Sequence, residues 1–76
     1  PERPASMWMK NTILPLDMFF IAADGTIINI AENTTPYSET PIRSGGPVRA
    51  VLELNAGQAH KHQFAIGDRV THSLFE

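Results

Sequence analysis

The residue types with the most chemical potential lie close together near the start of the chain, between Trp8 and Asp17. Trp8 favours burial, because its large ring is mostly apolar. Lys10, Asn11 and Asp17 are costly to bury unless each of them finds a hydrogen-bonding or charged partner. A stretch that mixes such groups predicts either a binding cleft or a satisfied polar network that holds the fold together.

The binding-cleft interpretation gives each of these side chains a role toward a ligand. Lys10 would supply a cation for an anionic group, Asn11 a donor and an acceptor, and Trp8 a flat apolar wall, with Thr12 beside them. In the structural interpretation, Asp17 accepts hydrogen bonds from the backbone, from Asn11 or from Lys10. Losing one partner of a buried pair is strongly destabilising, so the two interpretations predict different effects of mutating Asp17.

Tyr37 completes the candidate site, because it lies in a stretch rich in proline and hydroxyl side chains that is typical of a loop. An exposed loop tyrosine offers contact area to a partner at a low cost in conformational entropy. The alternative is that its ring covers the edge of the core.

No residue pattern indicates a catalytic or metal centre. His60 and His62 are two positions apart on a predicted helix, so they point about 200° away from each other and cannot share one ion there. The serines lie in no nucleophile motif. We therefore assign no catalytic residues, no metal and no cofactor, and an enzyme with Lys10 and Asp17 as an acid/base pair is kept as the alternative.

The composition describes one small domain. Seventy-six residues without a cysteine exclude disulfides and thiolate zinc sites. The net charge of −2 and the scattered lysines and arginines argue against a nucleic-acid surface, so a transcription regulator is the weaker alternative. No apolar run approaches the roughly 20 residues of a membrane span.

Short runs in which apolar and polar residues alternate predict a mainly β domain. Residues 7–9 predict a short first strand, and the nearly continuous apolar run 17–22 predicts a strand covered on both faces. Asp24-Gly25 predicts a two-residue hairpin turn leading into an antiparallel strand at residues 26–31.

The second half of the chain alternates less regularly. Residues 32–47 are rich in proline, glycine and hydroxyl side chains and predict a long loop. Residues 48–54 predict a strand, Asn55 an N-cap for a helix at 56–64, and residues 69–75 a last strand. The predicted fold is a small antiparallel β sandwich or barrel with one short α-helix, in the order β-β-β-loop-β-α-β.

The block that runs from Trp8 to Gly25 resembles the DUF192 family, also called UPF0127. Two later blocks, at residues 51–57 and 66–70, are similar to the second half of that family. The resemblance implies a small β-rich fold with one short helix, and a family of unknown function. It also implies that residues 1–76 form a single partial domain, the C-terminal two-thirds of a module that often follows a bacterial signal peptide.

The expected function is therefore a non-enzymatic ligand- or partner-binding domain of the bacterial envelope, periplasmic or secreted by resemblance. Its expected ligand is a small molecule or a protein, with no nucleic acid and no membrane span. We also expect an uncovered apolar strip, to be filled by a missing N-terminal segment or by a second copy of the chain. The residues expected to supply the apolar core are Phe19, Phe20, Ile28, Ile30, Val51, Leu52, Leu54 and Phe64.

Overall fold

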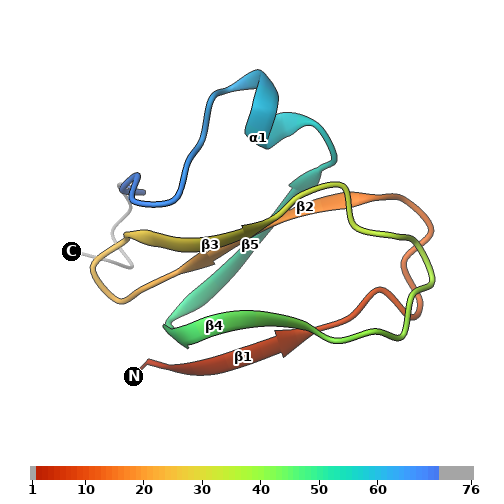
Figure 1. The fold of residues 1–76 in the computed structure, drawn as a ribbon, viewed down its shortest axis with the longest axis horizontal. Helices are drawn as coiled ribbons and strands as arrows, with labels where there is room; N and C mark the ends of the chain where they lie inside the picture. The colour runs from red at the N-terminus through yellow and green to blue at the C-terminus, as the bar shows by residue number, and fades with distance from the viewer. Residues whose placement is uncertain (1, 71–76) are drawn as a thin grey trace.

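The computed structural model describes residues 2–70, which form five strands, one short helix and two antiparallel sheets (Figure 1). The elements are β1 (Arg3–Met7), β2 (Leu16–Ile21), β3 (Ile27–Ala31), β4 (Ile42–Val48), β5 (Ala50–Asn55) and α1 (Gln58–Lys61). One sheet pairs β1 with β4, and the other has the order β3-β2-β5. The predicted mainly β fold with one short helix is therefore confirmed.

The central strand β2 separates two small hydrophobic cores, because successive side chains of a strand point to opposite faces. The first core contains Met9, Met18, Phe20 and Val48, and the second contains Phe19, Ile21, Ile27 and Ala59. The first lies toward β1 and β4, and the second lies toward α1. All residues of β2 after Leu16 are buried, so the strand is covered on both faces, as its apolar run predicted.

Strands β2 and β3 form the expected antiparallel hairpin, but its turn has three residues rather than two. The N–H of Ala22 donates to the Thr26 oxygen at 2.9 Å, and the N–H of Gly25 donates to the Ala22 oxygen at 3.0 Å. Only Gly25 within this turn has a positive φ, at 92°. Asp24 stabilises the turn through its side chain, because its Oδ1 accepts the Thr26 N–H, two residues further on, at 2.9 Å.

Two predictions about the residues of the β1-β4 sheet were wrong. The first strand covers Arg3–Met7 rather than residues 7–9, and the loop predicted at residues 32–47 ends early because β4 occupies its second half. The two strands pair with each other across a register shift between Pro4 and Ser6. Neither strand has the regular alternation on which the sequence prediction depended.

A buried serine explains how a run containing two glycines and a proline enters a strand. Ser44 is buried, its Oγ accepts the Ala5 N–H at 3.0 Å, and it donates to the Gly46 oxygen at 2.6 Å. The hydroxyl therefore replaces ladder hydrogen bonds that the irregular pairing of β1 and β4 leaves out.

Only Arg49 separates the end of β4 from the start of β5. Its N–H donates to the Ile21 oxygen of β2 at 2.8 Å. β5 then pairs with β2 along its whole length. Two residues expected in the core, Leu52 and Phe64, are each 41% exposed, so part of the apolar surface near β5 stays open among residues 2–70.

The helix prediction was wrong in its length and its cap. α1 has four residues, Gly57 stands at its N-cap position with φ 94°, and Asn55 is the last residue of β5. The strand predicted at residues 69–75 lies largely outside the described residues, within which Arg69 forms an isolated bridge with Thr26.

Candidate functional site

Asp17 is fully buried on the face of β2 that looks toward α1. Its Oδ1 accepts the N–H of Asn33 at 2.8 Å. Its Oδ2 accepts the N–H of Gly57 at 3.1 Å and the N–H of Ala59 at 2.9 Å. Both carboxylate oxygens are therefore occupied by backbone donors.

The two hydrogen bonds to Gly57 and Ala59 explain how such a short helix persists. A single helical turn is unstable alone, because it fixes many dihedral angles for few hydrogen bonds. Gly57 and Ala59 carry two of the N–H groups that every helix start leaves without an internal partner. Asp17 accepts both from a strand about 40 residues away, and in this respect it does what the sequence predicted for Asn55. Asp17 belongs to a structural network rather than to an open cleft.

Lys10 and Trp8 lie in a different environment from Asp17. Trp8 is 53% exposed, and the Lys10 Nζ lies 5.1 Å from the centroid of the Trp8 ring. Asn11 is exposed as well. Of the donors that the sequence offered to Asp17, the backbone N–H groups are the ones that bond it, and neither Lys10 nor Asn11 is among its hydrogen-bond partners. The buried, fully bonded carboxylate therefore gives no geometric support to an acid/base pair with Lys10.

Backbone hydrogen bonds join two loops, residues 8–15 and residues 32–41. The N–H of Met9 donates to the Ser38 oxygen at 3.1 Å, and the N–H of Tyr37 donates to the Thr12 oxygen at 3.1 Å. Both contacts join backbone to backbone, so they set the position of one loop relative to the other. We call these two loops together the loop end.

Thr34, which sequence reasoning did not select, anchors the loop end to β2. Its Oγ1 accepts the Leu16 N–H at 3.0 Å and lies 3.0 Å from the Leu16 oxygen. Its own N–H donates to the same oxygen at 2.9 Å. Thr34 is buried in a polar stretch, and nothing in the local sequence distinguishes it from Thr35.

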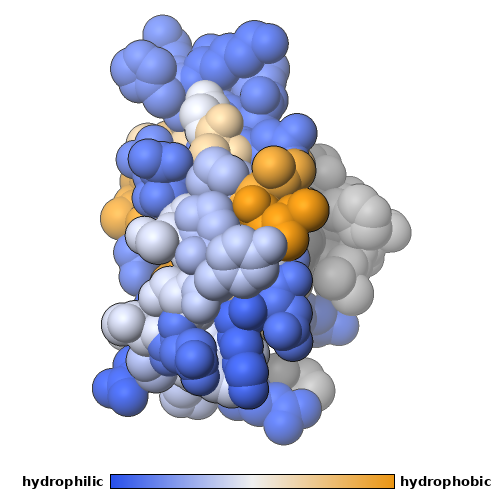
Figure 2. Space-filling view, turned by 90° about the vertical axis from the view of Figure 1, so that its right-hand side faces the viewer, coloured by the Kyte–Doolittle hydropathy of each residue, from blue (hydrophilic) through white to orange (hydrophobic). Residues whose placement is uncertain are grey.

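The loop end exposes four large apolar side chains. Ile13 is 66% exposed, Leu14 is 59% exposed, and Tyr37 is 62% exposed, in addition to Trp8. Figure 2, which looks at this end, shows a hydrophobic patch at mid-height on the right of a mostly hydrophilic face. The exposure of Tyr37 does not fit a ring that covers the core. Ile13 and Leu14 were not predicted as site residues.

The described residues offer little to a metal ion. No group of three or more histidine, aspartate or glutamate side chains within residues 2–70 is arranged to hold one. His62 instead lies with its Nε2 3.0 Å from the Gln58 Oε1. The helix within these residues is far too short to cross a membrane.

Comparison with known sequences agrees with the resemblance drawn from the Trp8 block. The sequence profile of DUF192, described as "Uncharacterized ACR, COG1430", matches residues 1–72. The chain belongs to the DUF192 family. No protein with a curated description matches this DUF192 chain significantly.

Two solved structures share the fold of this DUF192 chain. A protein of Sinorhizobium meliloti 1021, provisionally described as a transcription regulator, is 58% identical with a TM-score of 0.88. A protein of unknown function from Novosphingobium aromaticivorans DSM 12444 is 45% identical with a TM-score of 0.87. Each match covers 91% of this chain, but 54% of the first structure and 49% of the second. The chain therefore spans about half the length of these relatives.

Proposed function

We propose that this DUF192 domain is a non-enzymatic binding domain of the bacterial envelope that recognises a partner protein through its loop end. The observation that carries the proposal is the exposure of four large apolar side chains on two loops that backbone hydrogen bonds hold together. The four side chains are Trp8, Ile13, Leu14 and Tyr37.

The composition of the loop end supports a protein partner. Contiguous exposed apolar patches mark interaction sites, because exposing them to water costs free energy without stabilising the fold. Tryptophan and tyrosine are enriched among the residues that dominate protein interfaces. Lys10, held beside the Trp8 ring, adds a cation at the same place.

The fixed conformation of the two loops supports the proposal as well. Binding costs less when the binding surface is already in its bound conformation, because less conformational entropy is lost. Thr34 fixes the second loop to β2, and the bond between Tyr37 and Thr12 fixes it to the first loop. The surface therefore does not have to be ordered by its partner.

The envelope location rests on the resemblance to a family whose members often follow a signal peptide. Fractionation of cells that express the native gene tests it: the protein should separate with the periplasmic or secreted fraction. Recovery with the cytoplasmic fraction would contradict the location and leave the loop end as a binding surface to be tested separately. The acidic net charge gives no support to DNA binding.

Photo-crosslinking tests the binding proposal directly. A photoreactive phenylalanine derivative replaces Tyr37 in one variant and the exposed His60 of α1 in a control variant, both expressed in the native bacterium. We expect one protein to be captured from position 37 and not from position 60. The purified captured protein is then titrated with wild-type chain, with Trp8→Ala and with Lys61→Ala.

A binding role of the loop end predicts a loss of affinity in Trp8→Ala alone. An interface aromatic that contributes about 2 kcal/mol corresponds to a loss of about 30-fold. Equal affinities of all three proteins, or equal capture from positions 37 and 60, would exclude the loop end as the recognition surface.

A further inference from the structure

A groove lies between β1 and β5, next to the corner where β4 passes into β5. Figure 1 shows β1 and β5 starting near this corner and diverging from it. The groove has a volume of about 450 Å³ and is lined by residues of both strands, by Val48 at the end of β4 and by Arg49 between β4 and β5. It shares no lining residue with the loop end.

The two strands present open edges to the groove. Within residues 2–70, β1 pairs only with β4, and β5 pairs only with β2. β5 pairs with β2 in unbroken register over six residues, so alternate N–H and C=O groups of β5 point away from β2 in a regular row. Such a row is a template for a further strand.

β1 is the poorer of the two edges. Pro4 has no N–H to donate, and the register of β1 shifts between Pro4 and Ser6. An added strand therefore finds a continuous set of partners on β5 and an interrupted set on β1.

Apolar surface at the β5 edge also lacks a cover. Leu52 lies opposite Phe19 in the ladder, at the margin of the second core, and is 41% exposed. Val51, on the other face of the same strand, lines the groove. A strand beside β5 would bring apolar side chains against both residues, because neighbouring strands lie only about 4.8 Å apart.

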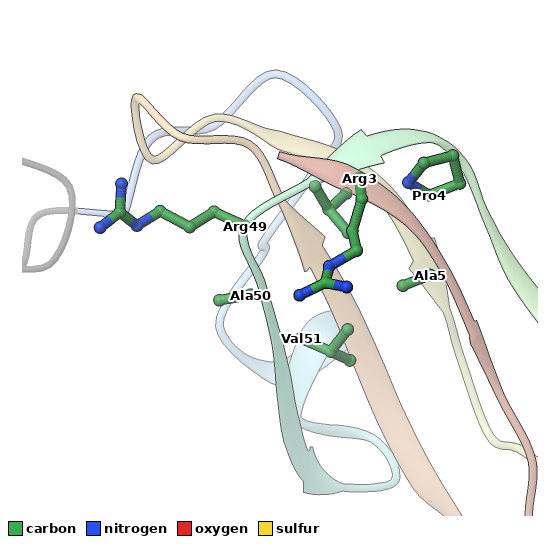
Figure 3. Close-up of a pocket in the computed structure, with 7 residues that line it drawn as sticks. Arg3, Pro4, Ala5, Arg49, Ala50 and Val51 are labelled. Atoms are coloured by element: carbon green, nitrogen blue, oxygen red, sulfur yellow. The ribbon is translucent and has the colours of Figure 1, made fainter. Parts of the chain in front are cut away.

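The charge of the groove is one-sided. Arg3 and Arg49 line it, and no aspartate or glutamate does. Figure 3 shows the Arg3 side chain extending into the groove beside Val51, whereas Arg49 points away from it. An arginine fork binds a carboxylate through two parallel hydrogen bonds. The groove therefore fits an extended segment that carries an acidic side chain.

The solved relatives contain enough polypeptide to supply such a segment. The matched region accounts for 54% of one structure and 49% of the other, so about half of each has no counterpart in this chain. A strand needs only about 5–6 residues.

We propose that the groove between β1 and β5 receives an extended peptide segment that pairs with the outer edge of β5 and presents a carboxylate to Arg3. The segment is of the kind that the longer relatives carry outside the matched region. It adds a fourth strand to the β3-β2-β5 sheet and covers Leu52. This docking site is independent of the partner proposed for the loop end.

Peptide titration of the ¹⁵N-labelled chain tests the proposal. Overlapping synthetic peptides of about 12 residues cover the unmatched half of the Sinorhizobium meliloti relative. We expect one overlapping set to shift the amide resonances of β5, and alternate β5 amides to exchange more slowly with solvent once the peptide is bound.

Arginine variants separate a strand site from general attraction to a basic surface. Arg3→Ala should weaken the active peptide about 10-fold, and so should replacing the acidic residue of the peptide by its amide. Arg43→Ala, which removes an exposed arginine of β4, should bind as wild type does.

Three results would overturn the proposal. The first is that no peptide shifts the β5 amide resonances, the second that the peptides shift only resonances of the loop end, and the third that Arg3→Ala and Arg43→Ala bind the peptide equally well.

A separate check uses the chain without peptide. If sedimentation shows concentration-dependent dimers, and hydrogen exchange shows that the β5 amides are protected in them, then a second copy of the chain occupies the groove instead.

Discussion

Oδ2 of Asp17 accepts the N–H of Ala59 at 2.9 Å, although the two residues are 42 positions apart in the sequence. One belongs to the central strand and the other to the first turn of α1. This contact makes the helix a dependent element, because its start is capped by the sheet rather than by its own flanking residue. The relationship leads to the first two predictions.

Asp17→Ala should be the most destabilising single change near the candidate site. It leaves the N–H groups of Asn33, Gly57 and Ala59 without their acceptor; the Ala59 bond is buried and the other two are partly buried. A buried unsatisfied donor costs about 1–3 kcal/mol, and a partly buried one costs less. We expect the free energy of unfolding in urea to fall by at least about 3 kcal/mol. Glu53→Ala, which removes an exposed carboxylate from β5, is the control and should stay close to wild type. Equal stability of the two variants would refute the cap.

Gly57→Ala should destabilise the chain, whereas Asn55→Ala should not. Gly57 has φ 94° and no atom within 4 Å of the position that a Cβ would occupy, so the cost is backbone strain alone, about 1–2 kcal/mol. Asn55 is exposed, and a surface change of this kind lies within about 0.5 kcal/mol of wild type. Thermal unfolding of the two variants measures the difference. A larger loss in Asn55→Ala would restore Asn55 as the cap.

Thr34→Val should loosen the loop end without changing its surface. Valine has a similar shape but leaves the Leu16 N–H without the hydroxyl oxygen that it contacts at 3.0 Å. We expect a loss of about 1–3 kcal/mol and faster hydrogen exchange at Tyr37 and Ser38. Thr35→Val, at the exposed neighbouring position, is the matched control. Identical exchange rates in both variants would show that Thr34 does not hold the loop.

The hairpin turn should show a pH dependence that originates in Asp24. The backbone hydrogen bond from Thr26 lowers the pKa of the Asp24 carboxyl below its ordinary value, with smaller contributions that include the Arg69 charge. A lowered pKa in the folded state means that the stabilisation is present above the ordinary pKa and is lost as the pH falls through the lowered one. An NMR titration should place the Asp24 midpoint below that of a solvated aspartate. In Asp24→Asn, the acid-dependent part of the hairpin's stability should disappear.

Local sequence was sufficient where the fold depends on neighbouring residues. The apolar run of β2 predicts a strand buried on both faces, and Asp24-Gly25 predicts the hairpin, because burial periodicity and turn chemistry act within a few residues. The block of residues that begins at Trp8 was also sufficient to indicate the family. The sequence favoured burial of Trp8, but its ring is 53% exposed, because the neighbouring Met9 takes the core position instead.

Only the tertiary structure decided the elements whose hydrogen bonds come from distant parts of the chain. β4 forms from a glycine- and proline-containing run because Ser44 and β1 complete its hydrogen bonding. The helix is short and is capped by Asp17 because strand alternation turns that carboxylate toward α1. The same alternation removes Asp17 from the surface, whereas Lys10, seven positions earlier in the sequence, is exposed. Composition and spacing specify which groups need partners, but the packing of β2 against α1 determines which partners they obtain.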